Sequence, residues 1–261
     1  MRKVALVTGG SSGIGRETVK ALVEAGCRVF SVSRRPVDRA DHICADVTDE
    51  AAVQAAAAQV LEEAGRIDIL VNCAGFGISG AVEFTELKEA KRQFDVNFFG
   101  MVNVNKAVIP VMRGQGAGRI VNISSVAAPV PIPFQTYYSA CKAAVNSYTM
   151  ATANELRPYG VTMCAVQPGD IATGFTDARA KSIAGDDVYG GRISRSVAVM
   201  EKDERGGMQP SVAGRYIAKI AQKKKVKPLY AIGFSYKAVC FLMKILPCGL
   251  ANRIVGMIYA K

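Results

Sequence analysis

The chain has 261 residues, half of which are hydrophobic, and this length is enough to bury the core of one large domain. His42 is its single histidine and its seven cysteines lack the spacing of a zinc site, so we expect neither a metal site nor a histidine-dependent catalytic triad. The scattered thiols, and an N-terminal apolar run too short for a signal peptide, predict a cytoplasmic protein.

The formal net charge of +11 is concentrated at the C-terminal end of the chain. Eleven of the 33 Lys and Arg residues, and none of the 22 Asp and Glu residues, lie from Arg205 onward. The preceding residues therefore carry equal numbers of basic and acidic side chains. This distribution does not predict a uniformly basic nucleic-acid surface, and we expect no nucleic-acid partner.

Apolar residues recur in patterns that alternate between strand and helix. Runs typical of buried strands cover Val4–Val7, Cys27–Val32, Ile43–Ala45, Ile67–Asn72, Arg119–Ser124 and Val161–Gln167. Helical spacing covers Arg16–Ala25, Thr48–Ala64 with Thr48 or Asp49 as N-cap, Glu86–Arg113 and Tyr138–Pro158. The polar stretch 33–42 is too short for a crossover helix, so a loop is expected there. These units predict an α/β fold, a doubly wound parallel sheet in one domain over residues 1–232.

A glycine-rich turn follows the first strand. Its spacing, Gly9-x-x-x-Gly13-x-Gly15, differs from the common G-x-G-x-x-G fingerprint. Glycines let the backbone approach a ligand closely, and the unpaired amides at the start of the next helix favour a phosphate. We therefore expect the pyrophosphate of a dinucleotide to contact Gly9, Ser11, Ser12, Gly13, Ile14 and Gly15.

The residues after the second strand bear on the choice of dinucleotide. An NAD enzyme places an acidic residue there to bind the ribose 2′-hydroxyl, but this chain has Ser33, Arg34 and Arg35. Two arginines suit the 2′-phosphate of NADP, because a guanidinium pairs with a phosphate in a planar arrangement. A solvated basic turn is the alternative, and the missing acid favours NADP over NAD.

Further polar and small residues follow the other strands, where an open parallel sheet binds its ligand. They are Asp46, Val47, Asn72, Ala74, Gly75, Pro168, Gly169, Ile171 and Thr173. With Thr8, the glycine turn, Asn97, Ser125 and the Tyr138-x-x-x-Lys142 pair, they resemble the short-chain dehydrogenase/reductase family over almost the whole chain. This resemblance implies a Rossmann fold, a nicotinamide cofactor contacted also by Tyr138 and Lys142, and a homodimer or homotetramer.

The resemblance also implies the catalytic residues Asn97, Ser125, Tyr138 and Lys142. Tyr138 and Lys142 are four residues apart and so share one helix face, where the ammonium is expected to lower the pKa of the phenol below its usual value of about 10. Adjacent strand residues point to opposite faces, and the family spacing selects Ser125 rather than Ser124. Asn97 resembles the family asparagine that supports a water-mediated proton relay to the lysine; satisfying helix backbone is its alternative role.

The expected substrate walls are apolar. They comprise the loop from Val126 to Phe134 and a substrate lid over about 174–209, which contains Phe175, Ile183, Val188, Tyr189, Val197, Val199 and Met200. Such walls suit a bulky apolar ketone or secondary alcohol. The alternative is that several of these residues simply pack onto the sheet.

Residues 233–261 form a hydrophobic, basic extension with helical spacing that is interrupted at Pro247. It falls short of the roughly 20 apolar residues of a membrane span. We expect it to cover the pocket or a subunit interface; peripheral contact with an anionic membrane, helped by the lysine run at 223–227, is the alternative. The extension resembles the tails of family members that act on steroids, retinoids or acyl-dihydroxyacetone phosphate.

Together these features predict an NADP(H)-dependent oxidoreductase that interconverts a ketone and a secondary alcohol on a steroid-like or lipid-like substrate. A 3-oxoacyl thioester reductase is the alternative enzyme, and the basic tail is compatible with its acidic carrier. A non-catalytic NADP-binding sensor is the alternative of another class. Such a sensor would not need Ser125, Tyr138 and Lys142, so their presence favours catalysis.

Overall fold

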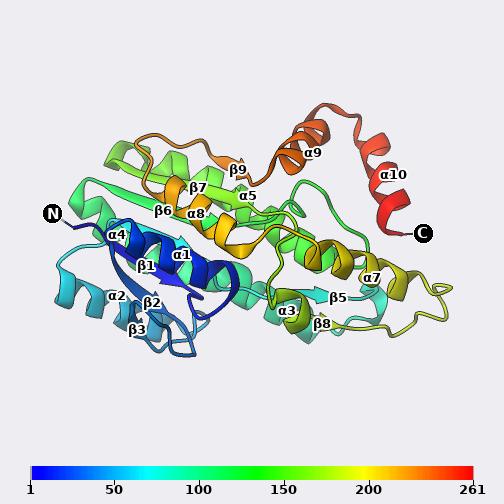
Figure 1. The fold of residues 1–261 in the computed structure, drawn as a ribbon, viewed down its shortest axis with the longest axis horizontal. Coiled ribbons are helices and arrows are strands. Elements are labelled where there is room, and N and C mark those ends of the chain that lie inside the picture. The colour runs from blue at the N-terminus through cyan, green and yellow to red at the C-terminus, as the bar shows by residue number, and fades with distance from the viewer. Residues whose placement is uncertain (1, 261) are drawn as a thin grey trace.

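The computed structural model describes residues 2–260 (Figure 1). Residues 1 and 261, at the ends of the expected ranges 1–232 and 233–261, lie outside the described residues. Within the described chain, a seven-stranded parallel sheet has the order β3-β2-β1-β4-β6-β7-β9. Its strands are β1 Val4–Thr8, β2 Arg28–Val32, β3 Asp41–Ile43, β4 Ile69–Asn72, β6 Gly118–Ile123, β7 Val161–Gln167 and β9 Leu229–Ala231. This confirms the doubly wound α/β fold.

Helices cover both faces of the sheet, because alternate strand residues point to opposite sides. In β1, Leu6 packs into one buried cluster while Ala5 and Val7 pack into the other. The Leu6 side carries α2 Glu50–Ala64, α4 Gly100–Gln115 and α5 Thr136–Leu156. The opposite side carries α1 Gly13–Glu24 and α8 Pro210–Ala221.

The long helix expected over Glu86–Arg113 is divided into three parts. It consists of α3 Leu87–Phe94, a π-helical segment Asp95–Phe99 and α4. A π-helical turn inserts an extra residue into the helix, and such turns occur frequently at functional sites. Here the widened turn contains the predicted site residue Asn97.

The other boundaries agree closely with the sequence pattern. The side chain of Asp49 accepts a hydrogen bond from the Ala52 amide at 3.0 Å and caps α2, so Asp49 rather than Thr48 is the N-cap. The third strand is Asp41–Ile43, two residues earlier than expected. The short strands β5 Ile78–Ser79, β8 Ala180–Lys181 and β9 were not predicted, because two or three residues are too few to show a period.

The C-terminal part contains α6 Phe175–Ala178, α7 Arg192–Arg205, α9 Phe234–Ile245 and α10 Cys248–Tyr259. Pro247 lies between α9 and α10, which confirms the predicted interruption. The two helices lie together at one side of the molecule, in the orange and red part of Figure 1. No helix within residues 2–260 is long and apolar enough to cross a membrane.

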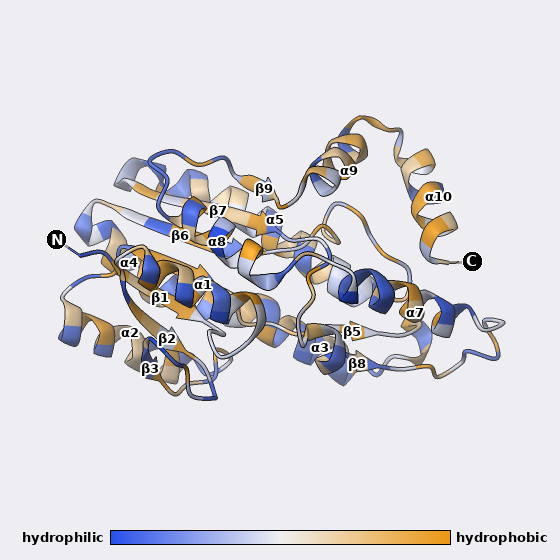
Figure 2. Ribbon diagram, viewed as in Figure 1, coloured by the Kyte–Doolittle hydropathy of each residue, from blue (hydrophilic) through white to orange (hydrophobic). Residues whose placement is uncertain are grey.

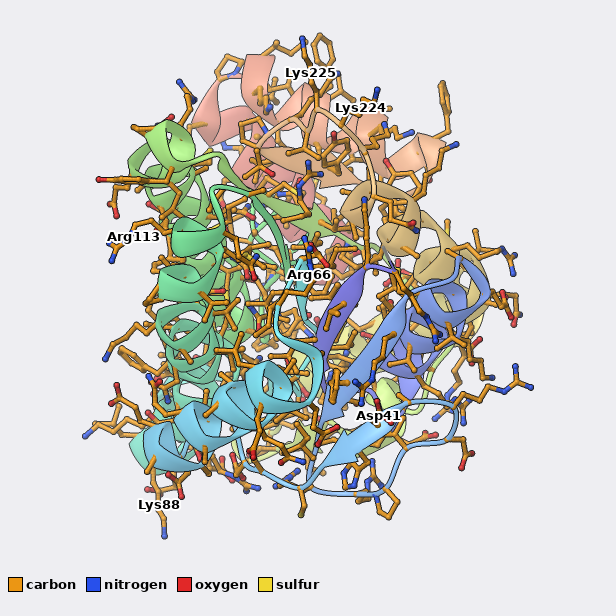
Figure 3. All side chains as sticks on the ribbon, turned by 90° about the vertical axis from the view of Figure 1, so that its left-hand side faces the viewer. Asp41, Arg66, Lys88, Arg113, Lys224 and Lys225 are labelled. Carbon is orange, nitrogen blue, oxygen red and sulfur yellow. The ribbon has the colours of Figure 1, made fainter. Side chains whose placement is uncertain are left out.

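The lysine run at 223–227 precedes β9, whereas α9 follows the other end of that strand. Figure 3 shows Lys224 and Lys225 on the left-hand face of the molecule as drawn in Figure 1, away from α10. The run and the tail thus lie at opposite ends of β9, and support of the tail at a membrane by this run stays a prediction. The two segments are close in sequence, but a strand of a parallel sheet separates them in space.

Candidate active site

The carboxyl ends of the strands open into a cavity of about 1150 Å³. Of the residues predicted to bind the cofactor or to act in catalysis, Asn72 alone does not line it. The lining includes Gly9, Ser11, Ser12, Gly13, Ile14, Gly15, Ser33, Arg34, Arg35, Asp46, Val47, Ala74, Gly75, Asn97, Ser125, Tyr138, Lys142, Pro168, Gly169, Ile171 and Thr173. The fold therefore gathers almost the whole predicted set around one space.

The glycine turn is pressed against the loop that follows β4. Gly9 has a φ of +68°, and a Cβ atom there would lie 2.8 Å from backbone atoms of Ala74. A Cβ on Gly15 would lie 2.2 Å from the Gly9 carbonyl oxygen. Thr8 Oγ1 accepts hydrogen bonds from the amides of Cys73 and Ala74 at 3.1 and 3.2 Å. Only glycine fits these positions, so the turn forms a cradle of bare backbone.

The start of α1 suits an anionic ligand. Ser12 is the N-cap residue, but its side chain forms no capping hydrogen bond, and the first turn of the helix has no acidic side chain. Gly13 and Ile14 also line the cavity. The amide groups and the positive end of the helix dipole thus fit a pyrophosphate.

Arg34 and Arg35 lie at the rim beyond this turn. The Arg34 side chain is 73% exposed, and its guanidinium is 3.8 Å from the Asp46 carboxylate. Burial raises the pKa of Asp46, but hydrogen bonds from Thr48 and the charge of Arg34 offset this effect, so the pKa lies below its usual value. The arrangement presents an exposed guanidinium at the predicted 2′-phosphate position.

Asn72 belongs to the interior rather than to the cavity, which corrects its predicted role. Its Nδ2 donates to the side-chain oxygens of Asn105 and Asn122, each at 2.9 Å, and Asn122 in turn donates to Thr149 at 3.0 Å. These buried amides connect β4, β6, α4 and α5. The side chain of the last residue of a strand can point either into the core or toward the ligand. The sequence does not distinguish between these two orientations of Asn72.

Tyr138 and Lys142 face the same part of the cavity from α5. The Lys142 ammonium lies 5.6 Å from the centre of the Tyr138 ring and donates to the Ile123 carbonyl oxygen at 2.9 Å. Burial lowers the pKa of Lys142. The predicted pairing on one helix face is present, with the lysine anchored to the end of β6.

The predicted effect on Tyr138 is wrong in direction. Burial raises the pKa of Tyr138 above its usual value, whereas a hydrogen bond with Ser125 and the charge of Arg179 lower it by less. The sequence places one cation near the phenol but does not show how deeply the phenol is buried, and desolvation has the larger effect on its pKa. The ring also packs against Phe175, with 5.8 Å between ring centres. Tyr138 therefore holds its proton.

The two serines after β6 have different surroundings. Ser124 is buried, and its hydroxyl donates to the Lys142 carbonyl oxygen at 3.1 Å. Ser125 accepts a hydrogen bond from the Ala127 amide and is hydrogen-bonded to Tyr138. Ser125 is thus the serine beside the phenol, as the spacing predicted.

Asn97 holds the loop after β4 in place. Its Nδ2 donates to the Phe76 carbonyl oxygen at 2.7 Å, and its Oδ1 accepts from the Phe76 amide at 2.9 Å. Its side chain thus satisfies loop backbone rather than the helix backbone considered as the alternative. Participation of Asn97 in a proton relay stays a prediction.

Apolar side chains line part of the cavity, on the side expected for the substrate. This lining includes Val126, Ala127, Val130, Ile132, Phe175, Met200, Tyr236 and Tyr259. Of the seven lid residues expected at the wall, only Phe175 and Met200 line the cavity. The other five do not: Ile183 and Val188, which are 64% and 71% exposed, and Tyr189, Val197 and Val199. Helical and loop residues of a variable segment cannot be assigned to an inner face without their tertiary contacts.

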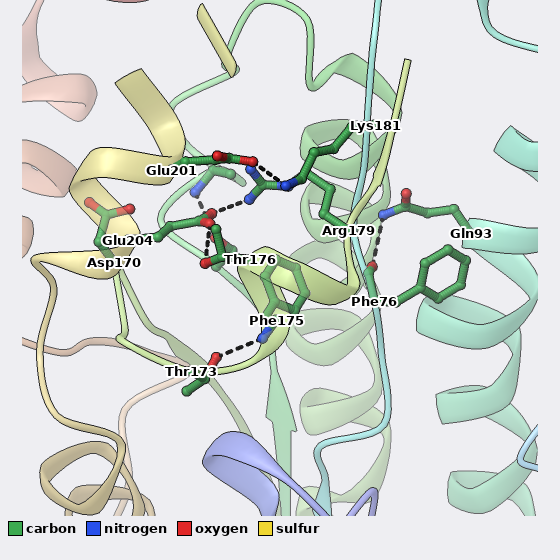
Figure 4. Close-up of polar contacts among 12 residues, drawn as sticks. Phe76, Gln93, Asp170, Thr173, Phe175, Thr176, Arg179, Lys181, Glu201 and Glu204 are labelled. Atoms are coloured by element: carbon green, nitrogen blue, oxygen red, sulfur yellow. Dashed lines mark hydrogen bonds and ion pairs between the residues drawn. The ribbon is translucent and has the colours of Figure 1, made fainter. Parts of the chain in front are cut away.

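A charged cluster at this wall was not predicted from the sequence. Arg179 is buried and forms an ion pair with Glu204, which also accepts a hydrogen bond from Thr176 at 2.7 Å (Figure 4). Asp170 accepts a hydrogen bond from the Tyr236 hydroxyl at 2.5 Å, and burial raises its pKa. Asp170 and Glu204 both line the cavity. The residues that pair with Asp170 and Glu204 lie more than 20 positions away in the sequence, so no local motif indicates the pairing.

Comparisons with known proteins bear on the family of this chain. The family model of the short chain dehydrogenases matches residues 3–184. The chain is 41% identical over 244 residues to the 3-ketodihydrosphingosine reductase of Bacteroides thetaiotaomicron, covering 89% of this chain and 91% of that protein. The crystal structure of a short-chain dehydrogenase from Streptomyces avermitilis superposes with a TM-score of 0.83 at 31% identity, covering 98% and 96% of the two chains.

A third relative carries a bound cofactor. The 3-ketoacyl-(acyl-carrier-protein) reductase from Brucella melitensis, complexed with NADH, matches with a TM-score of 0.74 at 25% identity over 88% of this chain and 96% of that one. The protein therefore belongs to the short-chain dehydrogenase/reductase family. It is an oxidoreductase that uses a nicotinamide cofactor, and the cradle of bare backbone at β1 fits that group.

Replacing Gly15 by Ala tests this cradle. The added Cβ would collide with the Gly9 carbonyl oxygen, so the dissociation constant for NADPH should rise by about tenfold or more, measured by cofactor fluorescence. Gly114→Ala is the matched control, because a Cβ there meets nothing within 4 Å. Unchanged affinity in a Gly15→Ala protein with normal circular dichroism would contradict the assignment.

Proposed function

We propose that the protein is an NADPH-dependent reductase of a long-chain lipid ketone, with an amino ketone of the 3-ketodihydrosphingosine type as the best candidate substrate. One observation carries this proposal. Ser125, Tyr138 and Lys142 line the same cavity as the glycine turn, and that cavity continues into an apolar wall.

The residues divide the chemistry between them. The bound cofactor supplies hydride to the carbonyl carbon. Ser125 donates a hydrogen bond to the carbonyl oxygen, and Tyr138 transfers its proton to that oxygen, so that a secondary alcohol forms. Because burial raises the pKa of Tyr138, the phenol stays protonated at neutral pH. The protonated phenol is the form that reduction requires.

The preference for NADPH rests on the rim after β2. Arg34 is exposed there and Arg35 lines the cavity. None of the residues 33–35 is acidic. A guanidinium favours the 2′-phosphate, whereas an acid would favour the 2′-hydroxyl of NAD.

The substrate class follows from two properties of the wall. Its apolar side chains suit an alkyl chain. Asp170 and Glu204 face the same space, and an ammonium group beside them would offset the desolvation that raises the pKa of Asp170. The 41% identical relative is named for reduction of 3-ketodihydrosphingosine, which carries both an alkyl chain and an amine.

A 3-oxoacyl thioester is the alternative substrate. The Brucella melitensis relative is named for that class, and the acid-free region from Arg205 onward suits an acidic carrier. Asp170, which has no ion pair with any described residue at the wall whereas Glu204 is paired with Arg179, favours the amino ketone, because a thioester brings no cation to it. A non-catalytic sensor would not require Ser125, Tyr138 and Lys142.

The substrate assignment is tested with NADPH and a panel of ketones, followed by the loss of absorbance of the reduced cofactor. We expect kcat/KM to be highest for 3-ketodihydrosphingosine, and about tenfold lower for a ketone of equal chain length without the amine. A soluble 3-oxoacyl thioester and a small polar ketone complete the panel. Preference for either of these two would contradict the proposal.

The cofactor assignment is tested by replacing Arg34 and Arg35 together with Ala. KM for NADPH should rise by about tenfold or more, because two charge-assisted contacts to phosphate are lost, while KM for NADH should change little. Arg39→Ala, in the same loop, serves as the control. Equal increases of KM for NADPH and for NADH would show that the arginines do not bind the 2′-phosphate.

A further inference from the structure

Helices α9 and α10 each have two apolar faces, of which one is used inside the molecule. Their inner faces contribute Cys240 and Val255 to a buried cluster with Val126 and Val130 of the loop after β6. Tyr236 and Tyr259 pack against the same cluster and line the cavity. The tail therefore covers one wall of the pocket, which agrees with one of its expected roles.

The opposite faces of these helices are apolar as well, although they are exposed. We call this surface the outer tail face; it comprises Phe234, Val239, Phe241, Leu242, Ile245, Leu250, Ile254, Met257 and Ile258. Phe234 is 89% exposed and Phe241 62%. Figure 2 shows the apolar colour along α10 and much of α9. Exposed apolar patches of this kind mark a protein or membrane contact.

The charged side chains on α9 and α10 are all of one sign. Lys237, Lys244 and Arg253 are exposed on the same two helices, and no acidic residue occurs from Arg205 to the end of the sequence. A second copy docked face to face would bring these cations together without a compensating carboxylate. An anionic surface, by contrast, would complement them.

The outer tail face also lies next to the pocket. Tyr236 and Tyr259 belong to the same two helices, and on the inner faces of these helices they line the cavity. Burying the outer face in a surface would therefore bring that surface beside the wall of the substrate cavity. No helix of the described chain is long and apolar enough to span a bilayer, so the contact would be interfacial.

We propose that the outer tail face docks onto an anionic lipid bilayer, with α9 and α10 lying in the interface. Docking brings the cavity next to the lipid, so that a long-chain ketone enters it without crossing bulk water. This second step rests on the proposed function, whereas the docking itself rests on the surface alone. Binding and activity are therefore measured separately.

The docking is tested by cosedimentation with vesicles of phosphatidylcholine alone and of phosphatidylcholine mixed with phosphatidylserine. The wild-type protein should bind the mixed vesicles, and high salt should weaken this binding. Replacing Phe241, Ile245 and Met257 together with Ser should lower the partition coefficient by about tenfold or more. The matched control changes Leu87 and Val212, exposed apolar residues on α3 and α8, to Ser and should bind normally.

A second variant, Lys244→Glu with Arg253→Glu, tests the charge without removing apolar area, and it should lose the preference for phosphatidylserine. Sedimentation velocity of the same proteins tests the alternative, in which a second copy of the chain covers the outer tail face. The proposal is overturned if the wild-type protein binds neither kind of vesicle. It is also overturned if the wild-type protein is an oligomer and the Ser variant is not, while the vesicle binding of the Ser variant is unchanged. Activity on a short soluble ketone should be equal in all variants, so failure of the proposed function is recognised independently.

Discussion

The contact between the β1 turn and the loop after β4 is the constraint on which the site depends. At this point the strand order reverses, because β2 and β3 lie on one side of β1 and β4 on the other. Gly9 and Gly15 allow the backbone to close up against Ala74, and Thr8 binds two amides of that loop. A larger residue here would separate the two segments and remove the cradle predicted to hold the pyrophosphate.

Desolvation is the largest influence on the pKa of each of the two residues proposed for catalysis on α5. Burial raises the pKa of Tyr138 and lowers that of Lys142, so both effects favour the neutral form. Lys142 also donates to the Ile123 carbonyl oxygen and so connects α5 to the end of β6. The burial of Tyr138 thus favours the protonated phenol, the form that carbonyl reduction requires.

The sequence predicted the features that depend on local spacing. Strand and helix periods gave the parallel sheet, glycine positions gave the cradle, and the interval of four residues placed Tyr138 and Lys142 on one face of α5. It could not predict the inward orientation of Asn72, the π-helical turn at Asn97 or the buried pair of Arg179 and Glu204. These depend on contacts between segments far apart in the chain, which leave no periodic signal.

The central claim is that Tyr138 supplies the proton, and the most direct test replaces it with Phe. Turnover of NADPH with a ketone substrate should fall by about a hundredfold or more, while the affinity for NADPH stays unchanged. Tyr137→Phe is the matched control, because Cys141 rather than a lysine stands four residues beyond it. Near-normal turnover by the Tyr138→Phe protein would contradict the account.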